Sequence, residues 1–289
     1  MYNINEMPKN KKEIPNSYAI NADTISQAWM QALEIWDEYG VKSLLDNGDM
    51  TKRINLVINI NNLNVDQVHP FCPITPRMMI DYRKEITEEY ADYQLSLKNN
   101  DDKKFVYNYA GEIFRQTKKF EIKNYSLWEI LKAWNRPQEY HNNMKENLLN
   151  LRENARRHVG VLWQNEIHIP MFEDQPCWIA YKFELLNENE LILYGVFRSW
   201  DLYRGMPANL PAIVYGVKKL IKELGLPYKL VKLIFYGMDV HIYKNAWDEV
   251  HDILNKKNTV RCPKCGNLLP KNTLLIHNNE KMCIGCRFK

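Results

Sequence analysis

Apolar side chains return every three or four positions in several stretches of the chain, which is the spacing of one face of an α-helix. After Asp23 or Thr24, either of which can cap a helix, this pattern runs as far as Gly40. Thr75 followed by Pro76 is typical of a helix start, because proline suits the first helical position. The pattern predicts helices over residues 23–39, 75–97, 210–224 and 247–254, and helical character over 128–134 and 140–152.

Other stretches alternate apolar and polar positions with a period of two, which is typical of β-strands. In residues 53–60 every second side chain is isoleucine or leucine. The same reasoning predicts strands over residues 158–163, 178–184, 190–198 and 236–243. A turn at residues 187–189 joins the strands over 178–184 and 190–198. Helices and strands are therefore mixed along the chain.

The composition is that of an ordinary globular protein. The chain has 289 residues, of which 45% are apolar and 26% charged, and is long enough to bury a full core. Its net charge of +4 suits an anionic substrate but does not by itself argue for nucleic acid. No run approaches the roughly 18 apolar residues of a membrane span, and residues 1–17 lack the apolar core of a signal peptide. We expect a cytoplasmic protein with a flexible N-terminus over residues 1–17.

Four of the six cysteines form two Cys-x2-Cys pairs near the C-terminus. Cys262 and Cys265 are followed, after seventeen intervening residues, by Cys283 and Cys286. In a reducing compartment this spacing predicts a structural zinc site with four thiolate ligands, and disulfides are the alternative. A polar linker at 255–258 then divides the chain into a main domain over residues 18–255 and a zinc ribbon over residues 259–289.

A further set of motifs lies in the second half of the chain. The sequence reads Pro176-Cys177, then Phe197-Arg198-Ser199-Trp200-Asp201, then Pro207-Ala208-Asn209, and later Asp239-Val240-His241-Ile242-Tyr243. In this order they resemble the thymidylate synthase family. The resemblance is closest to the branch common in archaea, within a superfamily that also contains pyrimidine nucleotide hydroxymethylases. It implies an α+β fold, a mixed sheet packed by helices, here with the small zinc ribbon added.

The resemblance gives these residues roles in adding a one-carbon unit to C5 of a pyrimidine nucleotide. The reaction needs a nucleophile that adds to C6, and this role falls to Cys177. A neighbouring guanidinium favours the thiolate, so Arg198 is the candidate for that effect and, with Ser199, for binding the nucleotide phosphate. Asp201 would lie by the pyrimidine and the folate-like cofactor.

Asn209 would select the base, because its amide offers one donor and one acceptor to O4 and N3–H of uracil. An asparagine amide can also turn over and pair with cytosine. Related deoxycytidylate hydroxymethylases carry Asp at this place, so Asn209 points to uracil and the expected substrate is dUMP.

Two more roles follow from the same resemblance in the first half of the chain. The family keeps a glutamate on an early helix, facing the pyrimidine, and in this branch it precedes Tyr-Ala. Glu89 fits this pattern and Glu88 is the alternative, although the three glutamates of this helix, Glu85, Glu88 and Glu89, also fit a solvated helix face. Tyr109, close before Gly111, is the candidate for assisting proton removal at C5.

The remaining predicted residues would hold the phosphate and the sugar. Arg53 is the candidate for an early phosphate-binding arginine. Arg156 and Arg157 resemble the pair that crosses a homodimer interface to bind the neighbour's substrate phosphate, and the alternative is two exposed arginines on a turn. His241 and Tyr243, two positions apart on a predicted strand, point to one face and would bind the sugar 3′-hydroxyl.

The chain departs from the family at two places. Trp178 stands where many synthases have histidine, and the C-terminal tail that closes over the ligands is not recognisable. Water exclusion decides whether the reaction yields methyl or hydroxymethyl, so the product stays open. The one-carbon donor would be 5,10-methylene-tetrahydrofolate or a methanopterin analogue. A nucleic-acid-binding or regulatory protein on this fold, acting through the ribbon, is a further alternative.

Overall fold

The computed structural model describes residues 15–45, 48–64, 69–97, 109–114, 117–119, 139–141, 144–149, 151, 158–163, 175–255, 259–270, 275–277, 280–283 and 286. Among these residues, no helix is both long and apolar enough to cross a membrane.

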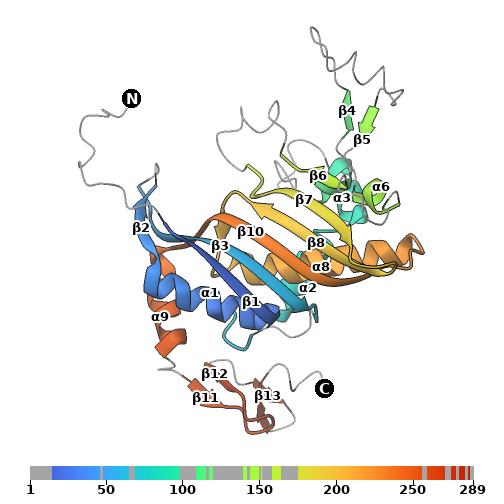
Figure 1. Cartoon of the computed structure of the whole chain (residues 1–289). Helices are drawn as coiled ribbons and strands as arrows, with labels where there is room; N and C mark the ends of the chain where they lie inside the picture. The colour runs from blue at the N-terminus through green and yellow to red at the C-terminus, as the bar shows by residue number, and fades with distance from the viewer. Residues whose placement is uncertain are drawn as a thin grey trace, which may run out of the picture.

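A mixed eight-stranded sheet forms the body of the protein (Figure 1). Along its main path the strands are β1 (Ser17–Thr24), β3 (Met50–Asn62), β10 (Lys229–Tyr243), β8 (Glu190–Phe197), β7 (Trp178–Leu185) and β6 (Val159–Val161). Off this path, β2 (Val41–Leu44) pairs with β3 and β9 (Trp200–Asp201) pairs with β10. β1 is parallel to β3, and β8 and β9 are parallel to β10, whereas the other pairs are antiparallel. The predicted α+β class is confirmed.

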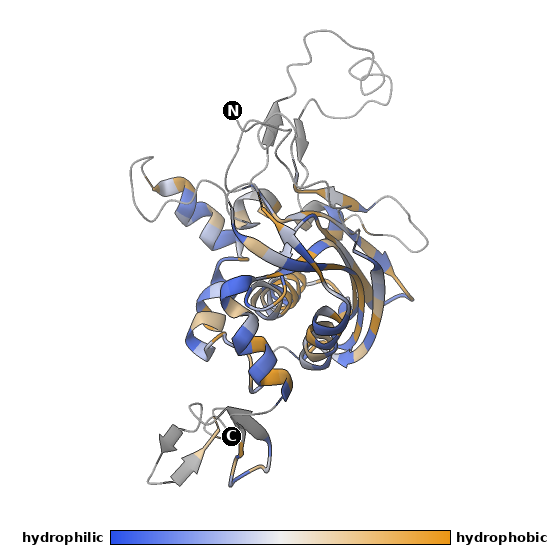
Figure 2. Ribbon diagram, turned by 90° about the vertical axis from the view of Figure 1, so that its left-hand side faces the viewer, coloured by the Kyte–Doolittle hydropathy of each residue, from blue (hydrophilic) through white to orange (hydrophobic). Residues whose placement is uncertain are grey.

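Helices lie against one face of the sheet (Figure 2). α1 (Ile25–Tyr39) starts directly after β1, because Thr24 and Gln27 form a capping box. The longest helix, α8 (Gly205–Glu223), has thirteen buried residues and lies in the core of the protein. α9 (Trp247–Asn255) follows the short 3-10 turn η2 (Lys244–Ala246). Four fully buried tryptophans fill the core between these helices and the sheet: Trp29, Trp36, Trp178 and Trp200.

Smaller elements complete the body. They are α2 (Pro76–Lys84), α3 (Glu88–Ser96), α4 (Tyr109–Phe114) and α6 (Met144–Leu149), with β4 (Thr117–Lys119) paired to β5 (Glu139–His141). Beyond α9, the C-terminal module consists of two antiparallel pairs, β11 (Thr259–Arg261) with β12 (Leu268–Pro270) and β13 (Leu275–His277) with β14 (Glu280–Met282).

The predictions for several strands were incomplete. The sequence predicts no element over residues 18–22 and a helix from Asp23, but residues 17–24 form β1. As an edge strand, β1 buries only Ile20 and Ala22, which is too few side chains for a clear period-two pattern. β2 was not predicted, and β10 begins at Lys229, ahead of the predicted start, and is interrupted by an irregularity between Gly237 and Val240.

The single helix predicted over residues 75–97 is two helices. α2 ends at Lys84 and α3 begins at Glu88. Thr87 lies at the break: its hydroxyl donates to the Lys84 carbonyl at 2.7 Å and accepts from the Tyr90 N–H at 3.4 Å. The side chain of Thr87 therefore competes with the backbone bonds of a continuous helix and caps α3.

Candidate active site and metal centre

Cys177 lies in a bend immediately before β7 and is half-buried. The bend is held to the end of β8, because the Arg198 N–H donates to the Cys177 carbonyl at 2.9 Å. Burial raises the pKa of the Cys177 thiol; the Arg198 guanidinium lowers it in part, and the Asp201 carboxylate raises it further. Arg198 therefore favours the thiolate, as the sequence predicts, but burial outweighs this effect.

The Arg198 guanidinium also fixes the chain that precedes the cysteine. Its Nε donates to the Pro176 carbonyl at 3.0 Å, and a terminal nitrogen donates to the Gln175 carbonyl at 2.8 Å. The group lies 5.8 Å from the centre of the Trp163 ring, within reach of a cation–π interaction. One side chain thus positions the loop that carries the thiol and supplies positive charge beside it.

Tyr109, at the start of α4, reaches the nucleophile loop from a distant part of the sequence. Its hydroxyl accepts a hydrogen bond from the Trp178 N–H at 3.4 Å, and its ring packs edge-on against Trp178. The Tyr109 hydroxyl therefore lies next to the residue that follows Cys177.

Asn209 lies in the first turns of α8 and is 6% exposed. Its Oδ1 accepts from the Trp200 indole N–H at 3.0 Å, and its Nδ2 donates to the Tyr82 hydroxyl at 3.3 Å. Tyr82 lies on α2 and Trp200 on β9, so the Asn209 amide is held between side chains of these two elements. No sequence pattern pointed to Tyr82.

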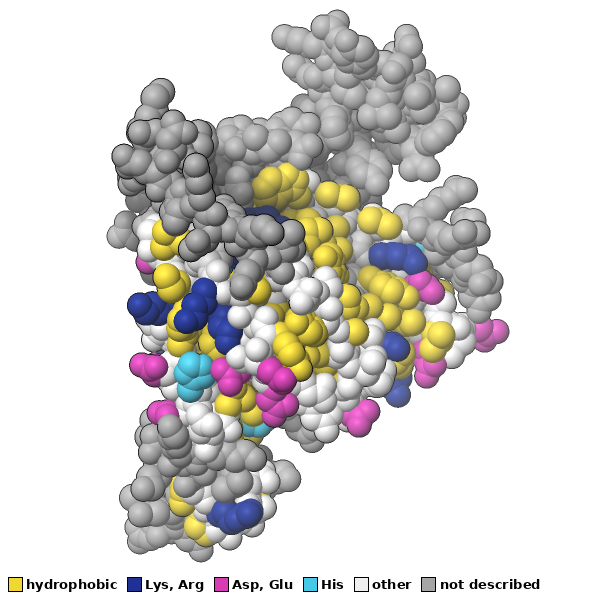
Figure 3. Space-filling view, turned by 60° about the vertical axis from the view of Figure 1, so that its left-hand side comes forward, with side chains coloured by type: hydrophobic (Ala, Val, Ile, Leu, Met, Phe, Trp, Pro, Cys, Tyr) yellow, Lys and Arg dark blue, Asp and Glu magenta, His cyan; other side chains and the backbone are white. Residues whose placement is uncertain are grey.

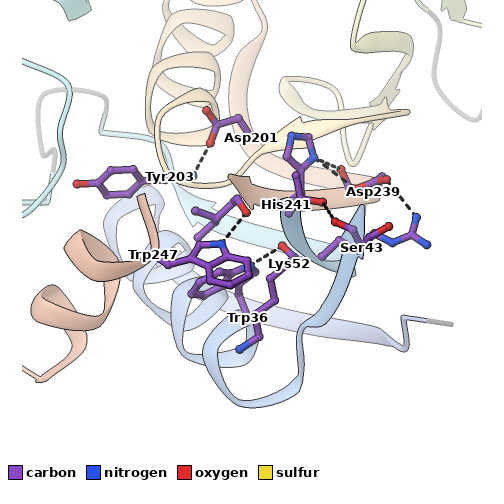
Figure 4. A network of polar contacts seen from close by, with 11 residues as sticks. Trp36, Ser43, Lys52, Asp201, Tyr203, Asp239, His241 and Trp247 are labelled. Carbon is purple, nitrogen blue, oxygen red and sulfur yellow. Dashed lines mark hydrogen bonds and ion pairs between the residues drawn. The ribbon is translucent and has the colours of Figure 1, made fainter. Parts of the chain in front are cut away.

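Asp201 ends β9 and orders the start of α8. Its Oδ1 accepts from the backbone N–H groups of Tyr203 at 2.8 Å and Arg204 at 3.1 Å. β9 and β10 pair so that Asp201 is opposite His241, and Figure 4 shows the two side chains near each other at the ends of these strands. The Asp201 carboxylate thus lies near both His241 and the Cys177 thiol, whose pKa its charge raises.

His241 and Tyr243 share one face of β10, as the sequence predicts, with ring centres 5.0 Å apart in an edge-to-face arrangement. His241 Nδ1 lies 3.3 Å from the Asp239 carboxylate, which also forms an ion pair with Arg53 at 3.4 Å (Figure 4). Arg53 projects from β3, opposite His241 in the register, and its buried Nε has no hydrogen-bond partner among the described residues.

Electrostatic effects show that these groups lie close together. Burial raises the pKa of Tyr82 and of Tyr243, and in both cases the charges of Cys177 and Asp201 raise the pKa further. An added Cβ at Gly205 would lie 3.2 Å from Asp201 Cβ and 3.5 Å from Asn209 Oδ1. Side chains from α2, β9, α8 and β10 therefore meet beside the nucleophile.

The four C-terminal cysteines form a second cluster. Their Sγ atoms all lie within 4.8 Å of one another, with separations of 4.0 Å for Cys262–Cys286, 3.6 Å for Cys265–Cys283 and 3.5 Å for Cys283–Cys286. A tetrahedral zinc ion with Zn–S bonds of about 2.3 Å places its sulfurs about 3.8 Å apart, whereas disulfide sulfurs are about 2 Å apart. The cluster fits a zinc ion bound by four thiolates.

Comparison with known proteins assigns the chain to a family. The family model for thymidylate synthase matches residues 17–274. The chain belongs to the thymidylate synthase family. It is 29% identical over 103 residues to a probable thymidylate synthase of Escherichia phage T5, a match that covers 36% of each chain. It is 30% identical over 82 residues to a thymidylate synthase of Zymomonas mobilis subsp. mobilis, covering 28% of this chain and 27% of the relative. The chain thus matches about a third of the length of these relatives.

The fold is also similar to a solved thymidylate synthase. The thermostable thymidylate synthase A from Bacillus subtilis superposes with a TM-score of 0.54 and 12% sequence identity, over 84% of this chain and 90% of that chain. At this identity the likeness shows a shared thymidylate synthase fold.

The structure does not bring Glu89, the predicted glutamate of the thymidylate synthase site, to the nucleophile. Glu89 lies on the exposed side of α3 and pairs with Lys219 at 2.6 and 2.7 Å. Lys219 is ten residues along α8 from Asn209, which corresponds to about 15 Å of helix. Glu88, the alternative, lies on the same first turn of α3.

Glu85, which the sequence analysis did not single out, is the carboxylate nearer the site. It follows α2 and is half-buried; burial, and then the charge of Asp81, raises the pKa of Glu85. Its charge in turn raises the pKa of Tyr82, which contacts Asn209. Glu85 lies three positions after Tyr82, on the same face of the helix, but no local signal distinguished it, because Tyr82 itself is not marked by any sequence pattern.

Two further predictions have different outcomes. Ser199 is half-buried in the bend that joins β8 to β9. It follows Arg198 and precedes Trp200, the residue that donates to Asn209. Arg156 and Arg157 lie outside the described residues, so their place relative to the site stays a prediction.

Proposed function

We propose that this protein transfers a one-carbon unit to C5 of the uracil base of dUMP. The observation that supports it best is the convergence of Cys177, Tyr109, Asp201 and Asn209, which come from separate elements, beside one half-buried thiol. Membership of the thymidylate synthase family agrees with this chemistry. Within the family, we favour the branch common in archaea, on the Phe197-Arg198-Ser199-Trp200-Asp201 and Pro207-Ala208-Asn209 motifs.

Each step of this reaction is assigned to a side chain of the protein. The Cys177 thiolate forms a bond to C6, and the electron pair of the C5–C6 double bond moves to C5, which becomes nucleophilic. Arg198 supports the thiolate, and Asn209 hydrogen-bonds to the base edge. Once C5 has bonded to the one-carbon unit, the Tyr109 hydroxyl, beside the loop that carries Cys177, assists removal of the remaining C5 proton, and the electron pair of that C–H bond leads to release of the cysteine.

Other groups hold the rest of the nucleotide. His241 and Tyr243 share one strand face and suit a sugar 3′-hydroxyl, which can donate and accept hydrogen bonds. Arg53, Arg198 and Ser199 are the described candidates for the phosphate, because a guanidinium binds phosphate with two parallel hydrogen bonds. We assign the glutamate that orders water around O4 to Glu85, because it is the C-cap residue of α2, one turn after Tyr82, which contacts Asn209, and because its raised pKa suits a proton relay.

The one-carbon donor would be 5,10-methylene-tetrahydrofolate or a methanopterin analogue, which supplies the methylene group and, for a methyl product, the hydride. The chemistry of the residues fits such a donor, because Asp201 offers an anionic acceptor beside the nucleophile to the N–H groups of a pterin.

Either of two products can follow from the same first steps. A methyl product requires hydride transfer, whereas entry of water gives a hydroxymethyl product. Incubation with dUMP and methylene-tetrahydrofolate, followed by mass spectrometry of the nucleotide, separates them: thymidylate synthase activity adds CH2, and hydroxymethylase activity adds CH2O. Cys177→Ala should give neither product while still binding dUMP. Turnover by Cys177→Ala would refute the mechanism.

We also propose that the protein acts as a homodimer formed through the open face of the sheet. Opposite the helices, half-buried apolar side chains follow one another across neighbouring strands: Val57, Tyr236 and Val196 in one row, and Ile234 and Tyr194 in the next. Hydrophobic side chains are visible across the face drawn in Figure 3. If Arg156 and Arg157 serve the partner's site, mixing inactive Arg156→Ala with inactive Cys177→Ala should restore part of the activity, and subunit exchange without any recovery would count against shared sites.

The C-terminal module is a candidate for a different role. We propose that Cys262, Cys265, Cys283 and Cys286 hold one structural zinc ion, because four sulfur ligands complete its tetrahedron and leave no open position for catalysis. Nucleic-acid binding through the module is the second candidate function. Arg261 and Lys264 carry positive charge next to the cluster, and co-purifying nucleic acid would appear as a high ratio of absorbance at 260 nm to that at 280 nm.

A further inference from the structure

The amide of Asn209 is held at both ends by other side chains. Trp200 Nε1 lies 3.0 Å from Oδ1, and the Tyr82 hydroxyl lies 3.3 Å from Nδ2. Asn209 is 6% exposed and Trp200 is 1% exposed, so water does not compete freely for these contacts. The two partners differ in chemistry, and this difference determines the orientation of the amide.

An indole N–H can only donate a hydrogen bond, whereas a hydroxyl can donate or accept. The atom of Asn209 that faces Trp200 must therefore be the oxygen, because an amide nitrogen there would set donor against donor. Tyr82 tolerates either orientation, since its hydroxyl accepts from an NH2 group and donates to a carbonyl. Of the two partners among the described residues, only Trp200 distinguishes the two orientations of the amide.

Trp200 is itself fixed. Its ring stacks on Phe197 with centres 4.2 Å apart and an angle of 2° between the planes, and it packs against Phe235 on the neighbouring strand. A Cβ added at Gly237 would lie 3.3 Å from the indole, so the strand passes close to the ring. The N–H therefore cannot turn away to follow a rotated amide.

Within the part of the chain that the structure describes, the fixed amide keeps one hydrogen-bonding position free at each end. Oδ1 has a second lone pair and Nδ2 has a second proton beyond those used by Trp200 and Tyr82. Uracil presents an acceptor at O4 and a donor at N3–H, which complement these positions. Cytosine presents a donor at N4 and an acceptor at N3, which would require the amide in the opposite orientation.

We propose that Trp200 is a specificity-determining residue, which holds the Asn209 amide in the orientation that accepts uracil and refuses cytosine. This inference rests on the proposed function, because it requires a pyrimidine nucleotide beside Asn209. It assigns Trp200 a positioning role, since the indole contacts Asn209 and acts on the base through that amide.

The test compares the affinities of dUMP and dCMP by isothermal titration calorimetry in the wild-type protein and in Trp200→Phe. Phenylalanine keeps an aromatic ring on Phe197 but removes the N–H. The wild type should prefer dUMP, and in Trp200→Phe the ratio of the two affinities should fall roughly tenfold, the effect of about one buried hydrogen bond. A residue that only supports the fold would lower both affinities alike.

Two more variants make the result specific. Trp247→Phe is the matched control, because it also removes an indole donor, here one that donates to the Ile242 carbonyl at 2.9 Å, and it should leave the ratio unchanged. Trp200→Met is a second donor-free variant with a flexible side chain, and it should lower the ratio as Trp200→Phe does. It keeps the test decisive if the phenylalanine variant does not fold.

The outcomes separate this inference from the proposed function. If the wild type binds neither nucleotide, both the proposed function and the role of Trp200 are refuted. If the wild type prefers dUMP and the folded Trp200 variants keep that preference, or lose both affinities equally, the proposed function stands and the role of Trp200 is refuted.

Discussion

Cys177 is subject to two opposing influences at the scale of single residues. Burial and the Asp201 carboxylate raise the pKa of its thiol, and Arg198 lowers it. Only the thiolate reacts with alkylating reagents, so the charge of Arg198 should determine how reactive Cys177 is at a given pH. The same guanidinium binds the carbonyls of Gln175 and Pro176, so its charge and its positioning role must be separated by experiment.

We expect the rate of Cys177 alkylation by iodoacetamide to rise with pH through the alkaline range, because the raised pKa keeps the thiol protonated near neutrality. Arg198→Ala should shift this profile to higher pH, since it removes the group that lowers the pKa. Arg198→Lys, which keeps the charge but not the bidentate contact, should shift it less. Peptide mass spectrometry resolves the site of alkylation.

Cys72 provides an internal reference for that experiment. Burial raises its pKa to about 12, so it should stay unmodified throughout. Faster alkylation of Cys177 in Arg198→Ala would contradict the assigned role of the guanidinium.

The residues that the sequence could identify are those carried by short motifs. Cys177, Arg198, Asp201 and Asn209 lie within one stretch of the chain and meet in the structure because β7, β8, β9 and α8 follow one another directly. Tyr82 contacts Asn209 across 127 positions of the sequence. A contact of that kind depends on how α2 packs against α8, and no local pattern encodes it.

At the scale of elements, the break between α2 and α3 supports our proposal that Glu85 is the glutamate of the site. Helical periodicity predicts one helix over residues 75–97, and Glu89 fits the family pattern because it precedes Tyr90-Ala91. Thr87 ends that continuity, since its hydroxyl bonds to the backbone on both sides. Glu85 then remains with Tyr82, whereas Glu89 turns to Lys219. Local side-chain capping, which competes with helix propensity, explains why the single predicted helix is two helices.

Replacement of each glutamate by glutamine tests this assignment. Glu85→Gln should lower kcat by about a hundredfold or more while dUMP still binds, because an amide keeps the shape but cannot relay a proton. Glu89→Gln is the matched control: it should keep kcat and lose at most about 1 kcal/mol of stability, since its ion pair is exposed. Steady-state kinetics with a thermal melt of each variant measures both. The reverse pattern would restore Glu89 to the site.

Elements with a buried face were predicted best. α1 and α8 carry long apolar stripes, and β3 alternates through most of its length, so their periodicity is clear. β2 has four residues, none of them buried, and β1 buries two side chains. Pairing with β3 holds these two strands in the sheet, and such pairing is a tertiary effect.

At the scale of the whole molecule, two parts of the chain have different sources of stability. The body has a large core around four buried tryptophans. The C-terminal module has about 30 residues and short strands, too few to fold on an apolar core alone, so a bound metal should supply its folding free energy. Within the cluster, Cys262, Cys283 and Cys286 are buried and Cys265 is exposed. A chelator can therefore reach a bound metal ion from the side of Cys265.

We therefore expect one zinc ion per chain by elemental analysis, and a loss of zinc in Cys262→Ser but not in the control Cys72→Ser. Removal of zinc by a chelator should abolish the hydrogen-exchange protection of β11–β14 while β3, β8 and β10 stay protected. A chain that ends at Asn255 should then show what the module does. If the module acts as a lid, the shortened protein binds dUMP but loses turnover or changes product, whereas retained activity indicates a separate partner. Two disulfides by mass spectrometry, or full zinc content in Cys262→Ser, would refute the metal site.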